Sequence, residues 1–277
     1  MMKIGIVGLG LIGGTYAKAL NPYQYEIIGF DKNQKVIDYA LETKMISKGT
    51  VTPKPYLKEC DIVFICLYPT DTVNFIKNNI NNFKRNAIVS DVTGIKRKLF
   101  NELDIYFNEG IEFVFAHPIA GSEKIGIKYS NKEIFQDANF VITHHKFNNE
   151  ETLNLIETLA KQMGFKTITR ITDVEHDKAL AFTSQLTHAI AIALVNSDSQ
   201  NVETKRFIGD SYKDLTRIAA INETLWTELF MDNKDFLVQN IDRFIDEMTK
   251  IKKALKDKNH DELTEIMIKA RKIREKI

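Results

Sequence analysis

The sequence predicts an α/β protein in which a doubly wound parallel sheet is followed by an all-helical domain. Through about residue 171, short β-rich runs alternate with longer helical patterns, which is typical of parallel α/β folds. After that point the β-rich runs stop, and residues 173–200 form a helical pattern whose centre, AIAIALV, is apolar around its whole circumference. We therefore divide the chain into residues 1–171 and residues 172–277.

Seven runs are the expected strands of the first domain: Lys3–Val7, Tyr25–Phe30, Asp61–Leu67, Ala87–Ser90, Phe113–Ala116, Asn139–Thr143 and Lys166–Thr169. Several are almost entirely apolar, as in IVFICL, which favours parallel strands buried on both faces. In the second domain, helical patterns continue over residues 211–231 and 233–277. A helix that is apolar on every side must be buried on every side, so we expect a second subunit to cover it in a homodimer.

Composition excludes several classes of protein. Lys and Arg number 38 against 37 Asp and Glu, so there is no electrostatic reason to expect nucleic acid or an anionic membrane as partner. No run approaches the ~18 apolar residues of a membrane helix, and the N-terminus opens directly on a structural motif, so we expect a cytoplasmic protein. Cys60 and Cys66 are too few for a disulfide framework or a zinc site, and we expect small core residues and no metal.

The first strand runs directly into the glycine-rich segment GLGLIGG, and a helix follows it. Gly8 allows a sharp turn, Gly10 lets the backbone approach a pyrophosphate, and Gly13 lets the helix pack closely on the strand. The second strand ends at Asp31, eighteen residues after Gly13, where a carboxylate accepts hydrogen bonds from the adenosine ribose. The segment predicts a Rossmann-type site that binds NAD in preference to NADP, although Lys32 weakens that preference slightly. We assign further cofactor contacts to Leu11, Ile12, Tyr68 and Pro69.

The six histidines differ in their candidacy for catalysis. His144 and His145 are expected in a loop, His260 in a charged tail, and His176 at an exposed or capping position near a helix start. His117 follows the strand run FVFA, so we place it at the carboxyl end of a sheet strand, where open α/β folds bind their ligands. There it could act as a general base, or it could be a loop histidine bonded to the backbone.

Polar side chains also interrupt the helical domain. His188 and Ser184 lie one turn apart in the apolar helix, where they either satisfy each other or bind a ligand. Asp214 and Arg217 are three residues apart on one helix face. They form an ordinary surface ion pair, or Arg217 binds a substrate carboxylate.

Taken together, five segments make the chain resemble the prephenate dehydrogenase family, which includes arogenate dehydrogenases. In order they are GLGLIGG, DVTGIK, HPIAGSE, TSQLTHAIAIAL and KDLTRIA, and they span nearly the whole chain. The resemblance implies a nucleotide-binding domain followed by a helical dimerisation domain. It also implies oxidative decarboxylation of a cyclohexadienol to 4-hydroxyphenylpyruvate in tyrosine biosynthesis.

The resemblance also assigns roles to individual residues. His117 would hydrogen-bond the ring hydroxyl and assist hydride transfer, Arg217 would bind a substrate carboxylate, and Asp214 would hold the arginine. His188 and Ser184 would line the substrate pocket, to which we add Ser122 and Thr93, while Trp226 is expected to pack in the core.

The chain departs from the family pattern at two segments. Gly94 stands where many members have a serine that orients the histidine, and we expect Thr93 or a water to replace it. Gln185 and Thr187 stand where many relatives have histidine and proline. The chain leaves no room for an appended regulatory domain, so any feedback by tyrosine would act directly at the active site.

Three alternatives remain beside prephenate oxidation. Prephenate and arogenate differ only by a keto or amino group on the side chain, which the sequence does not distinguish. A β-hydroxyacid dehydrogenase would carry a GxxxKxxxN pattern in the long helix, but residues 173–200 contain only Lys178 and no glycine. A non-catalytic NAD-sensing protein would not need His117, His188 and Arg217 to converge near the nicotinamide.

Overall fold

A six-stranded parallel sheet forms the first domain of the computed structural model, which describes residues 1–23, 25–107, 110–121, 124–198 and 203–276. Its strands are β1 (Lys3–Val7), β2 (Glu26–Phe30), β3 (Lys48–Thr50), β4 (Ile62–Ile65), β5 (Ile88–Asp91) and β6 (Glu112–Phe113). They are ordered β3-β2-β1-β4-β5-β6, the doubly wound order in which ligands bind outside the carboxyl ends of the strands. The predicted parallel sheet is confirmed, but the short strand β3 was not predicted, because its sequence KGT carries no apolar run.

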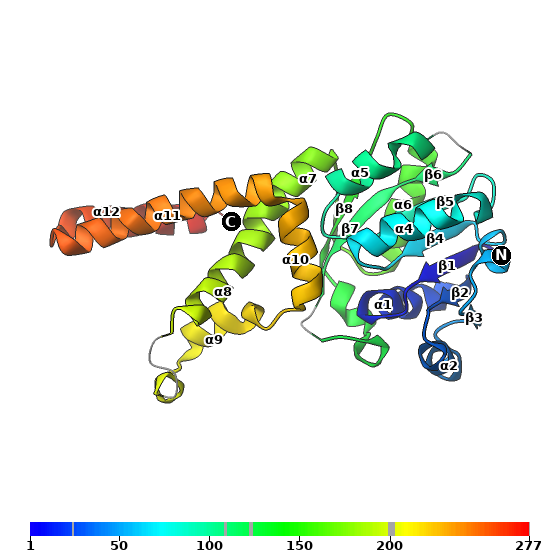
Figure 1. Ribbon diagram of the computed structural model, residues 1–277, viewed down its shortest axis with the longest axis horizontal. Coiled ribbons are helices and arrows are strands. Elements are labelled where there is room, and N and C mark those ends of the chain that lie inside the picture. The colour runs from blue at the N-terminus through cyan, green and yellow to red at the C-terminus, as the bar shows by residue number, and fades with distance from the viewer. Residues whose placement is uncertain (24, 108–109, 122–123, 199–202, 277) are drawn as a thin grey trace.

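Helices cover both faces of this sheet (Figure 1). One face is packed by α1 (Leu11–Leu20), α2 (Gln34–Glu42) and α6 (Glu150–Gln162), and the other by α3 (Lys54–Leu57), α4 (Pro69–Asn79) and α5 (Arg97–Leu103). Alternate residues of β4 belong to different clusters, because Phe64 packs with the first set of helices and Val63 with the second. Burial on both faces explains why this strand is a continuous apolar run.

The last three strands form a second, smaller sheet rather than an extension of the first. β7 (Phe115–Ile119) runs antiparallel to β8 (Asn139–Thr143), which runs parallel to β9 (Thr167–Ile171). The run that we expected as one strand, Phe113–Ala116, is therefore split at Val114 between the two sheets. The expected position of His117 just beyond a strand was wrong, since it lies within β7 opposite Val141.

The second domain consists of helices, and Figure 1 shows α11 and α12 extending away from the sheets as a long arm. The domain contains α7 (Asp173–Leu180), a π-helical segment (Ala181–Leu186), α8 (Thr187–Asn196), α9 (Asp210–Thr216), α10 (Glu223–Asp232), α11 (Lys234–Lys256) and α12 (His260–Arg274). Thr172 and Glu175 form a reciprocal capping box that begins α7. The predicted long helix is therefore interrupted by a turn with wider hydrogen bonding, which the apolar pattern did not reveal.

The helix α10 joins the two domains. Its Glu228 carboxylate accepts a hydrogen bond from the Thr70 backbone N–H at 3.1 Å, and Lys98 of α5 is 2.9 Å from Asp232. Asn222, the N-cap of α10, donates to the hydroxyl of Tyr68 at 2.9 Å. These contacts hold the helical domain against the carboxyl ends of the parallel strands.

Candidate active site

In the loop between β1 and α1, the three predicted glycines are favoured for different physical reasons. Gly8 has a φ of +85°, and a Cβ there would lie 2.7 Å from the carbonyl oxygen of Cys66. A Cβ on Gly13 would lie 1.9 Å from the carbonyl oxygen of Gly8, so only glycine permits this approach of α1 to the strand. A Cβ on Gly10 would meet no atom within 4 Å, which leaves open space before the N-terminus of α1. No side chain caps that N-terminus, so its N–H groups can bind an anion.

A cavity of about 370 Å³ opens beside this loop at the carboxyl ends of β1 and β2. Asp31 and Lys32 line it, together with Gly8, Phe30, Val51, Pro53, Leu67, Asp71 and Phe75. The Asp31 carboxylate accepts hydrogen bonds from the backbone N–H groups of Leu9 and Asn33, each at 2.9 Å. Tyr68 and Pro69 follow Leu67 directly and begin α4. The other lining residues were not predicted, although several follow strands whose carboxyl ends could have indicated them.

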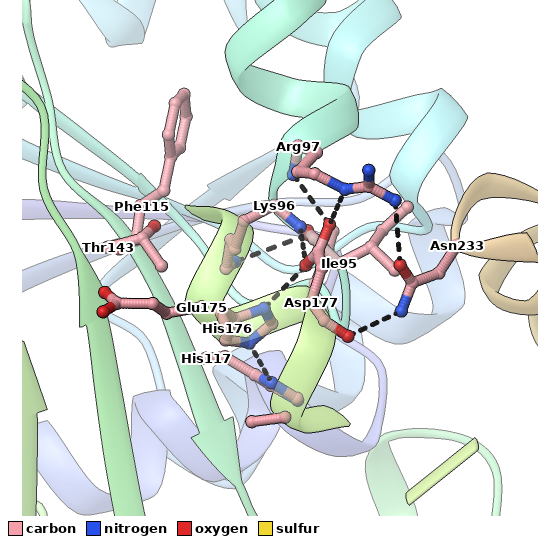
Figure 2. A network of polar contacts seen from close by, with 12 residues as sticks. Ile95, Lys96, Arg97, Phe115, His117, Thr143, Glu175, His176, Asp177 and Asn233 are labelled. Atoms are coloured by element: carbon pink, nitrogen blue, oxygen red, sulfur yellow. Dashed lines mark hydrogen bonds and ion pairs between the residues drawn. The ribbon is translucent and has the colours of Figure 1, made fainter. Parts of the chain in front are cut away.

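Figure 2 shows a chain of polar contacts that runs from His117 into the start of the helical domain. His117 Nδ1 is 3.0 Å from His176 Nε2, and His176 Nδ1 is 2.8 Å from Asp177 Oδ1. The Asp177 carboxylate also accepts the backbone N–H groups of Lys96 at 2.8 Å and Arg97 at 3.0 Å. His176 is fully buried, so the expectation of an exposed or capping histidine was wrong. The signal available in the sequence was the adjacent His-Asp pair at the start of an apolar helix.

A second buried pair fixes the strand that carries His117. Asp91 and Lys96, both from the segment DVTGIK, are fully buried, and Lys96 Nζ lies 2.8 and 2.6 Å from the two Asp91 oxygens. The Ala116 peptide is held from both sides, because its carbonyl accepts from Lys96 at 2.6 Å and its N–H donates to Asp91 at 3.1 Å. Thr93 donates its backbone N–H to Asp91 at 2.8 Å, and its hydroxyl contacts the same carboxylate. Thr93 therefore belongs to the support of this pair, and the partner of His117 Nδ1 is His176.

Burial controls the electrostatics of the two histidines. The pKa of His117 lies well below its usual range, because the ring is desolvated and because His176 and Lys96 disfavour a positive charge there. The pKa of His176 is also lowered by burial, although its hydrogen bond to Asp177 opposes that shift. Both rings are therefore neutral near neutral pH, and a neutral imidazole can accept a proton.

The helix α10 links the surroundings of His117 to those of His188. A Cβ on Gly94 would lie 3.7 Å from His117 Cε1 and 3.4 Å from a methyl group of Leu229 in α10. One turn earlier on α10, Trp226 stacks on His188 with ring centroids 3.6 Å apart. Trp226 is thus partly exposed against a predicted site residue rather than enclosed in the core.

His188 and Arg217 are brought into electrostatic contact. His188 Nδ1 lies 2.9 Å from the Ser184 carbonyl, so this nitrogen donates and Nε2 carries the lone pair. Burial lowers the pKa of His188, and the charge of Arg217 lowers it further. Arg217 and Asp214 both have exposed side chains. Gln185 instead has a structural position, since its amide contacts the Leu229 carbonyl and Asn233. Ser122 lies outside the described residues.

The other polar candidates have structural surroundings. Cys60 is buried, as expected, and burial raises its pKa to about 12. His145 is not simply a loop residue, because its ring stacks on Phe107 at 4.2 Å and contacts the Phe113 carbonyl at 3.0 Å. Within the described residues, no group of three or more His, Cys, Asp or Glu side chains could hold a metal ion.

Comparison with known proteins covers both domains. Residues 16–169 match the prephenate dehydrogenase nucleotide-binding domain, and residues 172–269 match the prephenate dehydrogenase dimerization domain. A cyclohexadienyl dehydrogenase of Zymomonas mobilis is 27% identical over 98% of this chain and 94% of its own length. A prephenate dehydrogenase of Bacillus subtilis is 26% identical over 93% of this chain and 71% of its own length. The crystal structure of prephenate dehydrogenase from A. aeolicus, in complex with hydroxyphenyl propionate and NAD+, superimposes with a TM-score of 0.90 at 26% identity, over 100% of this chain and 98% of that one.

Proposed function

The chain belongs to the prephenate dehydrogenase family, and from that premise we propose that it converts prephenate to 4-hydroxyphenylpyruvate with NAD, as a step of tyrosine biosynthesis. The observation that carries the proposal is the neutral His117 imidazole, whose Nδ1 is bonded to His176. The ring lies beside Gly94, which in turn lies against Leu229 of α10. We further propose that the nucleotide-binding and substrate domains meet at residues 171 and 172.

The loop residues fit a dinucleotide. The open space at Gly10 and the uncapped N-terminus of α1 suit a pyrophosphate, which the N–H groups of Leu11, Ile12 and Gly13 would bind. Asp31 sits at the edge of the adjacent cavity, where it would accept the ribose hydroxyls and exclude a 2′-phosphate. Gly8 completes the turn, and we include Tyr68 and Pro69 in this site because they follow the lining residue Leu67. Bound NAD supplies the acceptor for a hydride.

His117 performs the proton chemistry in this proposal. Its free ring nitrogen takes the proton of the ring hydroxyl as the hydrogen on the same carbon departs with its electron pair. The resulting carbonyl draws in the electrons of the carbon–carboxylate bond, so carbon dioxide leaves and the ring becomes aromatic. The imidazolium then returns its proton to the ring oxygen, which restores neutral His117 for the next turnover.

Residues of the helical domain bind and orient the substrate. Arg217 would pair with a substrate carboxylate and be steadied by Asp214, while the lone pair of His188 Nε2 would accept a hydrogen bond. The proximity of Arg217 to His188 supports a shared anionic subsite. We also assign substrate contacts to Ser184 and Ser122, whereas Thr93 supports Asp91 from a buried position and is not expected to reach the substrate.

An assay of NADH formation tests the reaction. Purified protein is supplied with prephenate or arogenate, each with NAD or NADP, and we expect the highest kcat/KM with prephenate and NAD. A higher value with arogenate would reassign the substrate, and no NADH with either would favour a non-catalytic NAD-sensing protein.

Two variants separate the proposed roles of His117 and Arg217. His117→Asn should lower kcat by ~10²–10⁴-fold if the residue is the general base. Arg217→Ala should mainly raise KM, because it removes binding that is common to substrate and transition state. Full turnover by the His117→Asn variant, with its fold verified by circular dichroism, would refute the mechanism.

We propose that the apolar helix is covered by a second copy of the chain. The stretch Asp173–Asn196 is long and apolar enough to cross a membrane, with mean hydropathy 1.3, and only 28% of its most apolar window is buried within one chain. The expectation that this helix is buried on all sides therefore fails for one chain and requires a partner. Ser184, Gln185 and His188 interrupt it, which argues against a membrane span. The match to a dimerization domain supports a homodimer. We place the enzyme in the cytoplasm, and light scattering that gave a monomer mass would overturn the dimer.

Tyrosine and 4-hydroxyphenylpyruvate both carry a phenol ring and a side chain that ends in a carboxylate. We therefore propose that tyrosine binds at the substrate site. Steady-state rates at several tyrosine concentrations should show competition with prephenate. Unchanged rates at millimolar tyrosine would exclude this regulation.

A further inference from the structure

His176 is buried in the contact between the two domains, and the proposed reaction does not use it directly. Both of its ring nitrogens are engaged, Nε2 with His117 at 3.0 Å and Nδ1 with Asp177 at 2.8 Å. Because both nitrogens are bonded and the ring is fully buried, His176 does not contact a substrate and acts through its two neighbours.

The direction of each hydrogen bond follows from the Asp177 carboxylate. This group already accepts the backbone N–H groups of Lys96 and Arg97, and an ionised carboxylate has no proton to donate. His176 Nδ1 must therefore be the donor toward Asp177. Because a neutral imidazole carries a single N–H, His176 Nε2 is left as an acceptor.

The hydrogen bond between the two histidines fixes the proton of His117 in turn. Its Nδ1 must carry the proton that is donated to His176 Nε2, so its Nε2 has none. Neutral His176 is required for this order, and the lowered pKa of its ring keeps it neutral at neutral pH. If His176 were protonated, the bond would reverse and His117 would lose its free nitrogen.

We propose that His176 is a positioning residue that locks His117 in the tautomer with an unprotonated Nε2. The inference rests on the proposed role of His117 as the general base. During the reaction the substrate proton moves onto His117 Nε2 while Nδ1–H stays bonded to His176, and the same proton later returns to the ring oxygen. Asp177 acts behind His176 by fixing its ring orientation, as the buried aspartate does in serine-protease triads.

Asp177 is a poor target for a test, because it also holds the N–H groups that precede α5. His176 offers a matched pair of substitutions. His176→Gln places an amide near the position of Nε2, where its oxygen can accept from His117, whereas His176→Leu has similar bulk and no acceptor. Both variants lose the bond to Asp177, so their difference reports the contact with His117 alone.

The primary measurement is the ¹⁵N NMR spectrum of the His117 ring in substrate-free wild-type protein, assigned with the His117→Asn variant. We expect a proton on Nδ1 and none on Nε2, and a proton on Nε2 would overturn the inference whatever the activity. In His176→Leu the fixed tautomer should be lost, while His176→Gln should retain it.

The kinetic measurement compares the two variants. His176→Leu should lose about 10- to 100-fold in kcat, by analogy with the loss on removing the partner that orients a metal-bound imidazole, while its KM stays close to the wild-type value. His176→Gln should recover most of that loss. Equal kcat for all three proteins would refute the positioning role. The expected tautomer together with a fully active His117→Asn variant would instead refute the base assignment and leave the tautomer assignment intact.

Discussion

Two glycines of the nucleotide loop should respond in opposite ways to the same added methyl group. In Gly13→Ala the new Cβ would lie 1.9 Å from the Gly8 carbonyl oxygen. The backbone of Gly8 is tied to the neighbouring strand, because its N–H donates to the Phe30 carbonyl at 2.7 Å. The helix α1 must shift, and overpacking of this kind costs about 1–3 kcal/mol or more. That is a large part of the about 5–15 kcal/mol that stabilises a typical domain.

In Gly10→Ala the methyl group meets no atom within 4 Å, and the φ of −77° suits alanine. We expect a stability loss of at most about 1 kcal/mol, because alanine is only a poorer N-cap. The methyl group does occupy the space proposed for the pyrophosphate, so NAD affinity should fall about 10- to 200-fold, the usual cost of one misplaced carbon in a binding site.

Urea unfolding followed by circular dichroism measures the first effect, and calorimetric titration with NAD measures the second. Gly10→Ala serves as the folding control for Gly13→Ala, and both are compared with the wild type. The reasoning fails if Gly10→Ala binds NAD as tightly as the wild type, or if Gly13→Ala unfolds at the wild-type urea concentration.

Three further predictions concern ionisable side chains. Lys96→Met should lower the free energy of unfolding by about 3–5 kcal/mol, because it leaves the Asp91 carboxylate buried without its cation, and a loss under about 1 kcal/mol in urea unfolding would contradict this. The pKa values of His117 and His176 are lowered in the folded state, so kcat/KM should persist below pH 6.5, and a pH–rate profile that falls at pH 6.5 would count against it. The same shifts mean that stability is present above the unfolded pKa and declines as pH falls below it. Asp31→Ser should raise the ratio of kcat/KM for NADP to that for NAD, and an unchanged ratio would remove Asp31 from the choice of cofactor.

The nucleotide-binding half of the site could be predicted because its determinants are local. Gly8 and Gly13 are required by close backbone contacts and Gly10 opens onto empty space, all within one loop, and Asp31 follows its own strand directly. The position of His117 is not determined by neighbouring residues in the sequence. Its position depends on the Ala116 peptide, which is held by Lys96 and Asp91, 20 and 25 residues earlier in the chain. Nothing in the run FVFAHP signals that the chain leaves one sheet and enters another at Val114.

His176 was misplaced for a related reason. Position near a helix start favours an exposed or capping role, and that expectation holds for Thr172 and Glu175, which form the capping box. The helix α7 packs, however, against α5 and β8, and His176 contacts His117 of β7. Such tertiary packing produces no periodic pattern in the sequence. The apolar centre of the helix is visible in the sequence, but which of its polar residues face the other domain is not.

The π-helical segment between α7 and α8 changes the direction in which the side chains after it point around the helix axis. His176 and His188 are twelve residues apart, and on an uninterrupted α-helix they would point about 120° away from each other. A π-helical turn holds one residue more than an α-helical turn, and each residue of an α-helix rotates by about 100°. The extra residue would therefore reduce the angle between the two side chains to about 20°. One additional residue in this segment would therefore place His176, near the start of the helical stretch, and His188, near its middle, on about the same side of the helix. Deleting one residue within Ala181–Leu186 would keep His176 and His188 but turn them to different sides of the helix.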